Sequence, residues 1–549
     1  MGIFILGSLA GIPSVPFTVF EWLIRVLPGR LVIFGLELTV SVLEGLGFNI
    51  KNTAKTAEQV LAISSLFLAG LVIGLLFFII VKKVVKNGDS ERVRRYGLLV
   101  GAVLGLFSAV ITLIQAPPES IAGKVGAVIW VLGFFLLWGW GMARLYLFMA
   151  VPSRAAPEVS AAEVGPGAPP EGRPLEQIGA DGRALVPAEA QALSRRRFLI
   201  QVGGLFATIV VVGAGVGQVL RAQASPEPRE TVKAPIPFPN ADSPVEPVTG
   251  TRPEYTAVAD HYQIDINLTP PSVDATSWRL AISGLVAQPV SLMLDQIKAD
   301  YRPMNQFVTL SCISNPLGGP LIGTTLWTGA SFREVLAQTS PMSEAKYAQV
   351  ESEDGFHESI DLAMVNDDPR IMLTYAWNGE PLPARHGFPL RVYIPDRYGM
   401  KQPKWIKSIE LAAEPVSGYW VARDWDEKAE MNTTSVIDTV ATDDLIMRGG
   451  RTFVPIGGIA HAGAKGISKL EVQVDDGPWE AAELRAPLSG LTWVVWRYEW
   501  PFAEGQHQFG VRAYDGQGRM QETEESPVFP SGATGIYRKQ AEIPPVLGQ

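Results

Sequence analysis

The chain has 549 residues, of which 47% are hydrophobic and 18% are charged, and its formal net charge is −9 at pH 7. This length predicts several domains, and with a negative net charge no nucleic-acid partner is expected. The single cysteine excludes an intrachain disulfide, a zinc site built from cysteine pairs and a cysteine-ligated iron–sulfur cluster.

The first 220 residues contain five apolar segments, each long enough for the roughly 20 residues that a membrane-spanning helix needs. These segments are residues 15–46, 60–81, 96–116, 125–151 and 198–220. The first carries five charged side chains, so a long tilted helix, an interfacial helix and a hairpin all fit it. We predict that residues 1–151 form a multi-pass transmembrane region of three or four α-helices.

Basic side chains crowd the loops that follow the second and the fourth apolar segments. They are Lys82, Lys83, Lys86, Arg92, Arg94 and Arg95 in one loop, and Arg154, Arg173, Arg183, Arg195, Arg196 and Arg197 in the other. The positive-inside rule places both loops in the cytoplasm, and the two helices between them agree with this. The chain after residue 221 is therefore expected on the periplasmic or extracellular side of a bacterial inner (cytoplasmic) membrane.

Residues 194–199, Ser-Arg-Arg-Arg-Phe-Leu, carry a twin-arginine export pattern, and Ala222-Gln-Ala224 fits a signal cleavage site. The alternative is an ordinary basic anchor for a membrane helix. We predict a twin-arginine-like signal or transmembrane helix at 194–224, after a flexible cytoplasmic linker at 152–193. A Pro-rich spacer at 225–250 follows.

Residues 251–430 mix apolar strand patterns with short helical ones, which predicts an α+β domain. Strands are expected at 278–284, 307–311 and 391–395, and a short helix at 331–338. Cys312 ends one of these strands and precedes a Ser-Asn-Pro-Gly-Gly turn, so its thiol is placed to meet a ligand. The alternative for a lone free cysteine is a small buried apolar side chain.

Four segments of this region resemble the sulfite oxidase family of molybdenum–molybdopterin enzymes, and they occur in the family's order. They are Thr309-Leu-Ser-Cys-Ile-Ser-Asn-Pro-Leu-Gly-Gly319, residues 325–336, Leu382-Pro-Ala-Arg-His-Gly-Phe-Pro-Leu-Arg-Val-Tyr-Ile-Pro395 and residues 396–407. The resemblance covers about residues 255 to 537. It implies that the Cys312 thiolate is the catalytic metal ligand, beside two sulfurs from the pterin dithiolene.

The same resemblance implies a set of cofactor-binding residues. His386, Arg391 and Lys404 match positions that hold the pterin and its phosphate, which guanidinium and ammonium groups suit. Tyr262, Gln263, Asn267, Ser352 and Gln402 complete the predicted set. For each of these residues the alternative is a solvated surface group or an ordinary strand residue.

Two positions depart from the sulfite-oxidising members of the family. Those members have a tyrosine where this chain has Trp425, and an arginine where it has Asp265. Because arginine and tyrosine would bind and polarise an oxyanion, an acidic residue in that place would repel sulfite. Oxygen transfer is still expected, whereas sulfite as the substrate is left open.

Residues 431–549 are nearly all strand and turn, with alternating runs at 467–474, 492–500 and 507–514. The spacing predicts an all-β immunoglobulin-like sandwich, and the resemblance implies a dimerisation domain.

We therefore predict a membrane-anchored molybdenum–molybdopterin oxidoreductase of sulfite oxidase type. It would transfer an oxygen atom, with two electrons, to or from a small-molecule oxo acceptor or donor. The five histidines all lie after residue 260 and there is one cysteine, so we expect no haem and no Fe–S cluster. Electrons would then pass to or from a separate carrier, a cytochrome or a quinone-linked protein. Membrane lipid and a second copy of the chain are the other expected partners.

The alternative is a cofactor-free extracytoplasmic binding or assembly module on a membrane anchor. A transporter with a sensor domain fits less well, because the later apolar segments hold few of the charges that mark a substrate path.

Overall fold

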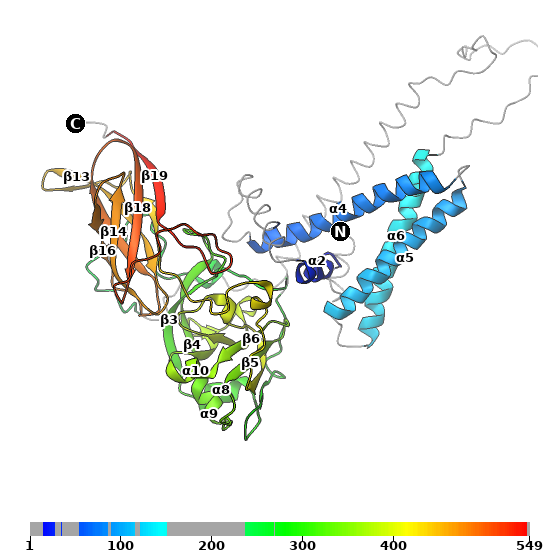
Figure 1. Ribbon diagram of the computed structural model, residues 1–549, viewed down its shortest axis with the longest axis horizontal. Coiled ribbons are helices and arrows are strands. Elements are labelled where there is room, and N and C mark those ends of the chain that lie inside the picture. The colour runs from blue at the N-terminus through cyan, green and yellow to red at the C-terminus, as the bar shows by residue number, and fades with distance from the viewer. Residues whose placement is uncertain are drawn as a thin grey trace, which may run out of the picture. The chain divides into compact units, whose positions relative to one another are not determined.

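The structure is a computed structural model, shown in Figure 1. It describes residues 15–27, 35, 54–85, 89–115, 121–150, 237–267 and 270–545. The chain divides into two compact units, Met1–Arg25 with Ala62–Pro228, and Val26–Leu61 with Arg229–Gln549. The predicted signal at 194–224, the apolar segment at 198–220 and the linker at 152–193 lie outside the described residues.

The first unit is helical. Its described helices are α2 (Val15–Val26), the part of α4 (Ala54–Val84) from Ala62 onward, α5 (Ser90–Gln115) and α6 (Ile121–Ala150). Three stretches are long and apolar enough to cross a membrane, namely Leu61–Val84, Ser90–Ile114 and Lys124–Leu147. They match the second, third and fourth predicted segments. In the first predicted segment the described helix α2 has 12 residues, which is too short to span a bilayer.

Glycines bring α5 and α6 into close backbone contact. A Cβ atom added to Gly97 would meet the backbone oxygen of Gly139, and one added to Gly139 would meet that of Gly97. Farther along, Gly101 lies in the same way against Phe135, so the two helices run antiparallel. Small residues allow this approach, which is how helices pack where no hydrophobic effect drives them together.

The second unit begins with two sheets. The first has the order β2–β1–β10–β5–β6, formed by Val290–Leu292, Leu280–Gly284, Ile406–Ala412, Tyr347–Ser352 and His357–Asp361. The second joins β3 (Met304–Ser311), β4 (Ile322–Ser331), β7 (Met372–Trp377) and β8 (Glu380–Pro381), with β9 (Arg391–Tyr393) paired to β7. The only parallel pair that the structure describes in these two sheets is β1 with β10.

Short helices connect these strands. They are α8 (Leu294–Asp300), α9 (Phe332–Ala337), α10 (Leu362–Asp367) and the 3₁₀ turns η3 (Val258–Asp260), η4 (Ala384–His386), η5 (Gly399–Lys401) and η6 (Val421–Arg423). The predicted helix at 331–338 is confirmed as α9, which starts at Phe332 because the Ser331 hydroxyl caps it by accepting from the Glu334 N–H. The predicted strand at 278–284 is confirmed from Leu280 onward.

The C-terminal region consists of two antiparallel sheets. One contains β11 (Thr434–Val440), β12 (Ile446–Arg448), β13 (Arg451–His461), β16 (Glu483–Leu484) and β17 (Val494–Pro501). The other contains β14 (Ile467–Val474), β15 (Trp479–Ala481), β18 (Gly505–Asp515) and β19 (Tyr537–Ile543). Side chains of both sheets, among them Ile456, Trp496, Val472 and Phe509, form one core. The three predicted runs are confirmed as β14, β17 and β18.

Candidate active site

Cys312 follows directly after β3, whose last five residues are buried. Its N–H donates to the Leu321 carbonyl (3.0 Å), and its own carbonyl accepts from the Asn315 N–H (3.1 Å), which closes the turn after the strand. The Sγ atom lies 3.0 Å from the Ser314 hydroxyl. Burial raises the pKa of the thiol, so a thiolate here requires a positive charge close by, such as a bound metal ion.

Two buried tyrosine side chains interact electrostatically with this thiol. Burial, and then the negative charge of Cys312, raise the pKa of Tyr262 well above its ordinary value. Burial also raises the pKa of Tyr398 to about 12, with a smaller contribution from Cys312. A Cβ atom on Gly399 would lie 3.1 Å from the Tyr262 hydroxyl, so glycine lets η5 approach that ring. Both hydroxyls keep their protons at neutral pH.

Beside this position, buried aromatic rings and imidazoles are packed together. The ring of His386 lies 4.6 Å from Trp377 and 5.6 Å from His261, while Trp327 lies 4.9 Å from Trp377. Burial lowers the pKa of His261 to about 3 and that of His386 well below its ordinary value. Both imidazoles are therefore neutral at physiological pH.

Arg391 places a guanidinium under these rings. Its carbon Cζ lies 4.7 Å from the Trp327 ring centre, and one nitrogen donates to the His386 carbonyl at 2.9 Å. The residue is 3% exposed and forms no ion pair with a carboxylate among the described residues. Burial lowers the pKa of Arg391 to about 10, so the group is still charged at neutral pH. A buried cation without an anion is costly, which indicates that an anionic group completes this site.

Lys404 differs from Arg391 because it already has an anion. Its ammonium contacts the carboxylate of Asp265 and donates to the Ile264 carbonyl at 3.1 Å. The Gln263 amide also donates to Asp265, at 2.5 Å. The side chain of Asp265 is 1% exposed. Asp265, the acidic residue at which the chain departs from the family pattern, is thus the buried counter-ion of Lys404.

The other predicted residues are Gln402, Ser352 and Asn267. Gln402 donates to the carbonyls of Arg397 (2.9 Å) and Ile394 (3.3 Å), and its buried Oε1 atom has no partner among the described residues. The Ser352 hydroxyl is buried and likewise without a described partner. Asn267 donates to the carbonyl of Asp354, two residues after Ser352.

Residues 267–420 match the family model described as "Oxidoreductase molybdopterin binding domain". By this match they are similar to the molybdopterin-binding domains of oxidoreductases. The human "Sulfite oxidase, mitochondrial" is 26% identical over 309 residues, covering 48% of this chain and 56% of that protein. The barley "Nitrate reductase [NAD(P)H]" is 26% identical over 305 residues, covering 45% of this chain and 34% of that protein. The "Putative protein-methionine-sulfoxide reductase subunit YedZ1" of Azospira oryzae is 34% identical over 148 residues, covering 27% of this chain and 54% of that protein. The chain thus spans between a third and just over half of these relatives.

The residues of the molybdopterin-binding domain fit a cofactor of this type. Five buried side-chain nitrogens that lie close together make no hydrogen bond of standard geometry with the described residues. They are His261 Nε2, His386 Nε2, Arg391 Nε, Trp327 Nε1 and Trp377 Nε1. Buried polar groups are normally satisfied, and a polar, heteroatom-rich ring system with a phosphate would satisfy these. Cys312 would supply one soft protein ligand to the metal, in addition to the sulfurs of a pterin dithiolene.

Three of these five residues, His261, Trp327 and Trp377, were not predicted as site residues from the sequence. Trp327 lies in one of the four resembling segments, and His261 precedes Tyr262, which was predicted. Trp377 comes from β7, which pairs with β4 but lies 50 residues away along the chain. No sequence motif marks it, because only the strand pairing brings it opposite Trp327.

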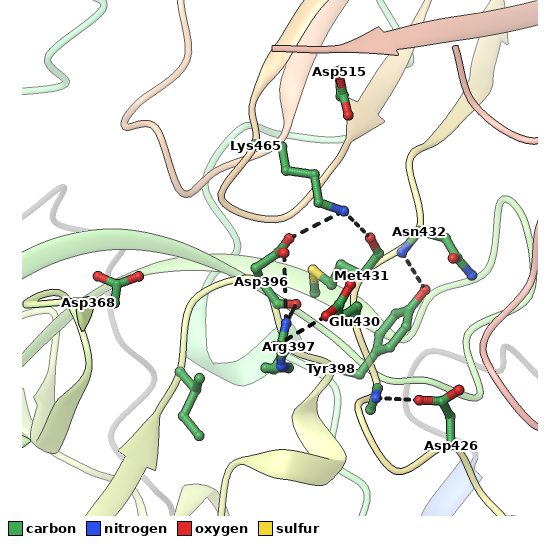
Figure 2. Close-up of polar contacts among 12 residues, drawn as sticks. Asp368, Asp396, Arg397, Tyr398, Asp426, Glu430, Met431, Asn432, Lys465 and Asp515 are labelled. Atoms are coloured by element: carbon green, nitrogen blue, oxygen red, sulfur yellow. Dashed lines mark hydrogen bonds and ion pairs between the residues drawn. The ribbon is translucent and has the colours of Figure 1, made fainter. Parts of the chain in front are cut away.

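A polar network joins the molybdopterin-binding domain to the C-terminal sheets (Figure 2). Lys465 donates to the Met431 carbonyl at 3.0 Å and lies 3.7 Å from the Asp396 carboxylate. The Tyr398 hydroxyl accepts from the Asn432 N–H at 3.2 Å. Since Asp396 and Tyr398 flank η5 on its N-terminal side, these contacts fix the segment that approaches Tyr262.

Gly463 lies against this network, which yields a prediction. Its φ angle is +60°, and a Cβ atom there would meet the carboxylate of Asp396. Gly466 has a similar φ of +71°, with no atom within 4 Å of an added Cβ, and serves as the control. Gly466→Ala should cost about 1 kcal/mol, from the left-handed backbone alone. Gly463→Ala should cost about 1–3 kcal/mol more, because it also displaces Asp396. Urea unfolding of the two variants measures the difference, and equal costs would contradict the role of Asp396.

Proposed function

We propose that the protein is a molybdenum–molybdopterin oxidoreductase that transfers an oxygen atom, with two electrons, between a small substrate and the cofactor. The observation that carries this proposal is the buried group of unpartnered nitrogens beside Cys312, with an uncompensated arginine among them. When bound, the cofactor supplies the oxo transfer and stores the two electrons.

The side chains of the chain have separate tasks in this proposal. Cys312 would bind the metal as a thiolate, and its strand-end position keeps the sulfur fixed through the Leu321 and Asn315 bonds. Arg391, still charged at neutral pH, would hold the phosphate. The neutral imidazoles of His261 and His386 would each present the Nε2 atom to the pterin, since Nδ1 of His261 already lies 3.4 Å from the Tyr262 carbonyl. The Tyr262 hydroxyl keeps its proton, so it would add no negative charge beside the thiolate.

We propose that the substrate is bound without the paired cation that an oxyanion such as sulfite would favour. Asp265 is buried and holds Lys404, and Trp425 has no hydroxyl to offer. Oxidation of a sulfite-like compound and reduction of a sulfoxide or related oxide both remain within this proposal. In the reductive direction, the oxide takes two electrons and two protons and releases water.

The remaining parts of the proposal concern placement and partners. We propose that the catalytic unit lies on the periplasmic or extracellular side, which the basic residues at one end of the helices support. A separate carrier, a cytochrome or a quinone-linked protein, would exchange the electrons. The two C-terminal sheets, with their shared core, would be an immunoglobulin-like sandwich through which two copies dimerise.

Molybdenum analysis of the purified protein, beside the Cys312→Ser variant, tests the proposal. We expect near-stoichiometric metal in the wild type, made in a host that synthesises the cofactor. Activity with an artificial electron dye should fall at least about a hundredfold in the variant, because a hydroxyl is a poor substitute for a soft thiolate ligand. A wild type without molybdenum would favour the cofactor-free binding module instead.

A further inference from the structure

The three long helices of the first unit meet in a small core at one end of the bundle. Val81 of α4, Val93 of α5 and Ala143 of α6 are buried there and pack in one cluster. This cluster sets the ends of the helices at a common level, since α4 ends three residues after Val81 and α5 begins three residues before Val93.

Cationic side chains lie at this end of the three helices. Val81, Val93 and Ala143 each have a cation as a direct neighbour in the chain, and further cations lie close by in the sequence. The set is Lys82, Lys83, Arg92, Arg94, Arg95 and Arg144, all of them exposed. We call these six residues the basic rim. They come from three helices, so it is the packing of the helices, rather than one basic run, that gathers them.

Only part of this charge is neutralised. Asp89 lies 3.1 Å from Arg92, and Glu91 lies 2.5 Å from Arg95. Asp89 also caps α5 by accepting from the N–H groups of residues 91 and 92. The other four cations of the basic rim make no ion pair with a carboxylate among the described residues. The rim therefore carries an excess of positive charge.

Aromatic side chains mark the same end of the bundle as the boundary of a bilayer. Trp140 is 40% exposed and Tyr96 is 39% exposed. The Arg144 guanidinium lies 5.1 Å from the Trp140 ring centre. Exposed tryptophan and tyrosine collect where the hydrocarbon meets the headgroups, and cations beside them lie at the depth of the phosphates.

We propose that the basic rim is a binding site for the headgroups of acidic phospholipids. An excess of cations at phosphate depth, drawn from three packed helices, favours anionic over zwitterionic lipid. The opposite end of α6 offers a contrast, because its described cation is Lys124 alone. The proposal does not depend on the chemistry of the Cys312 site.

Reconstitution of the full chain into nanodiscs tests this site. Wild-type protein is extracted from mixed phosphatidylglycerol and phosphatidylcholine bilayers, and the retained lipids are counted by native mass spectrometry at low and high salt. We expect phosphatidylglycerol to be retained several-fold over phosphatidylcholine at low salt, and this preference should shrink at high salt. Equal retention of the two lipids by the wild type would overturn the proposal.

Variants locate the site. Glutamine replaces the four unpaired cations, Lys82, Lys83, Arg94 and Arg144, singly and together, and Lys124→Gln is the matched control. Each rim substitution should weaken phosphatidylglycerol retention roughly fivefold, the effect of one basic residue near an anionic surface. The control should leave it unchanged. If Lys124→Gln weakens retention as much as a rim variant does, the rim is not a distinct site. The wild-type comparison decides the question even if the quadruple variant fails to insert.

Discussion

Replacing Arg391 by methionine should empty the site without unfolding the protein. The guanidinium is buried, and its described polar contact is one backbone carbonyl, so the folded chain gains little from its charge in the absence of an anion. Losing the cation–π contacts with Trp327 and Trp377 should lower the stability by about 0.5–2 kcal/mol. Removing the buried, desolvated charge should raise the stability and so offset part of this loss. We expect the unfolding free energy of the cofactor-free chain to stay within about 1–2 kcal/mol of wild type.

Cofactor retention should respond very differently. A buried charged contact to a phosphate, once removed, costs about 2–5 kcal/mol, so pterin content should fall by more than about tenfold. Pterin is measured by fluorescence after acid release, and stability by urea unfolding of protein from a cofactor-deficient host. A cofactor-free variant that is destabilised by about 3–5 kcal/mol would show that Arg391 is a structural cation instead.

Arg485 is the matched control for this prediction. It is buried like Arg391, but its guanidinium pairs with Glu254 at 2.8 Å and donates to the carbonyls of Val245 and Asn240. Arg485→Met leaves the Glu254 carboxylate without its cation, so we expect a loss of about 3–5 kcal/mol of stability. Protein that still folds should keep its pterin. The two arginines thus separate the cost of an unpaired buried charge from the loss of a ligand contact.

Local sequence patterns predicted the parts of the site that depend on one segment. The apolar run before Cys312 and the Asn-Pro-Gly-Gly turn after it predict a strand ending at a thiol, and β3 ends at Ser311. The resembling segments named His386 and Arg391, which the structure brings into contact. The contact between Trp377 and His261 was not predicted. It depends on strand pairing and on the packing of η3, which a local sequence pattern does not indicate.

The pairing of Asp265 with Lys404 was missed for a related reason. The two residues are 139 positions apart, so the sequence showed an acidic residue in an unexpected place but not the cation that it neutralises. Charge complementarity between distant segments becomes visible only after folding. Asp265, which is unexpected in a site for an oxyanion, forms a buried ion pair with Lys404 in the folded chain.

A second buried ion pair holds η5, the turn that approaches Tyr262, and breaking this pair should have a large effect. Lys401 lies in η5, and its ammonium is 2.7 Å from the Glu358 carboxylate, whose side chain is 1% exposed. Lys401→Met would leave that carboxylate buried without a cation, at a cost of about 3–5 kcal/mol at pH 8. Since η5 also carries Gly399 against Tyr262, we expect pterin content to fall as well.

The pH dependence identifies the cause. Burial raises the pKa of Glu358, while Lys401 acts against this, so removing the lysine should raise that pKa further. A carboxyl whose pKa is raised by folding binds its proton more tightly in the native state. Its stabilising contribution is therefore present below the unfolded pKa of glutamate and is lost as the pH rises through the folded value. The Lys401→Met variant should thus be most defective at pH 8 and approach wild-type stability near pH 5.

Two further variants make this prediction specific. Lys407 and Glu351 form a pair at 3.1 Å whose side chains are 37% and 55% exposed, so Lys407→Met should cost less than about 1 kcal/mol. The double variant Lys401→Met with Glu358→Gln removes both charges and should recover most of the lost stability at pH 8. A Lys401→Met defect that is the same at pH 5 and pH 8, or that Glu358→Gln does not relieve, would mean that the lysine acts through packing. In that case η5 is held in place by its apolar neighbours rather than by the buried charge pair.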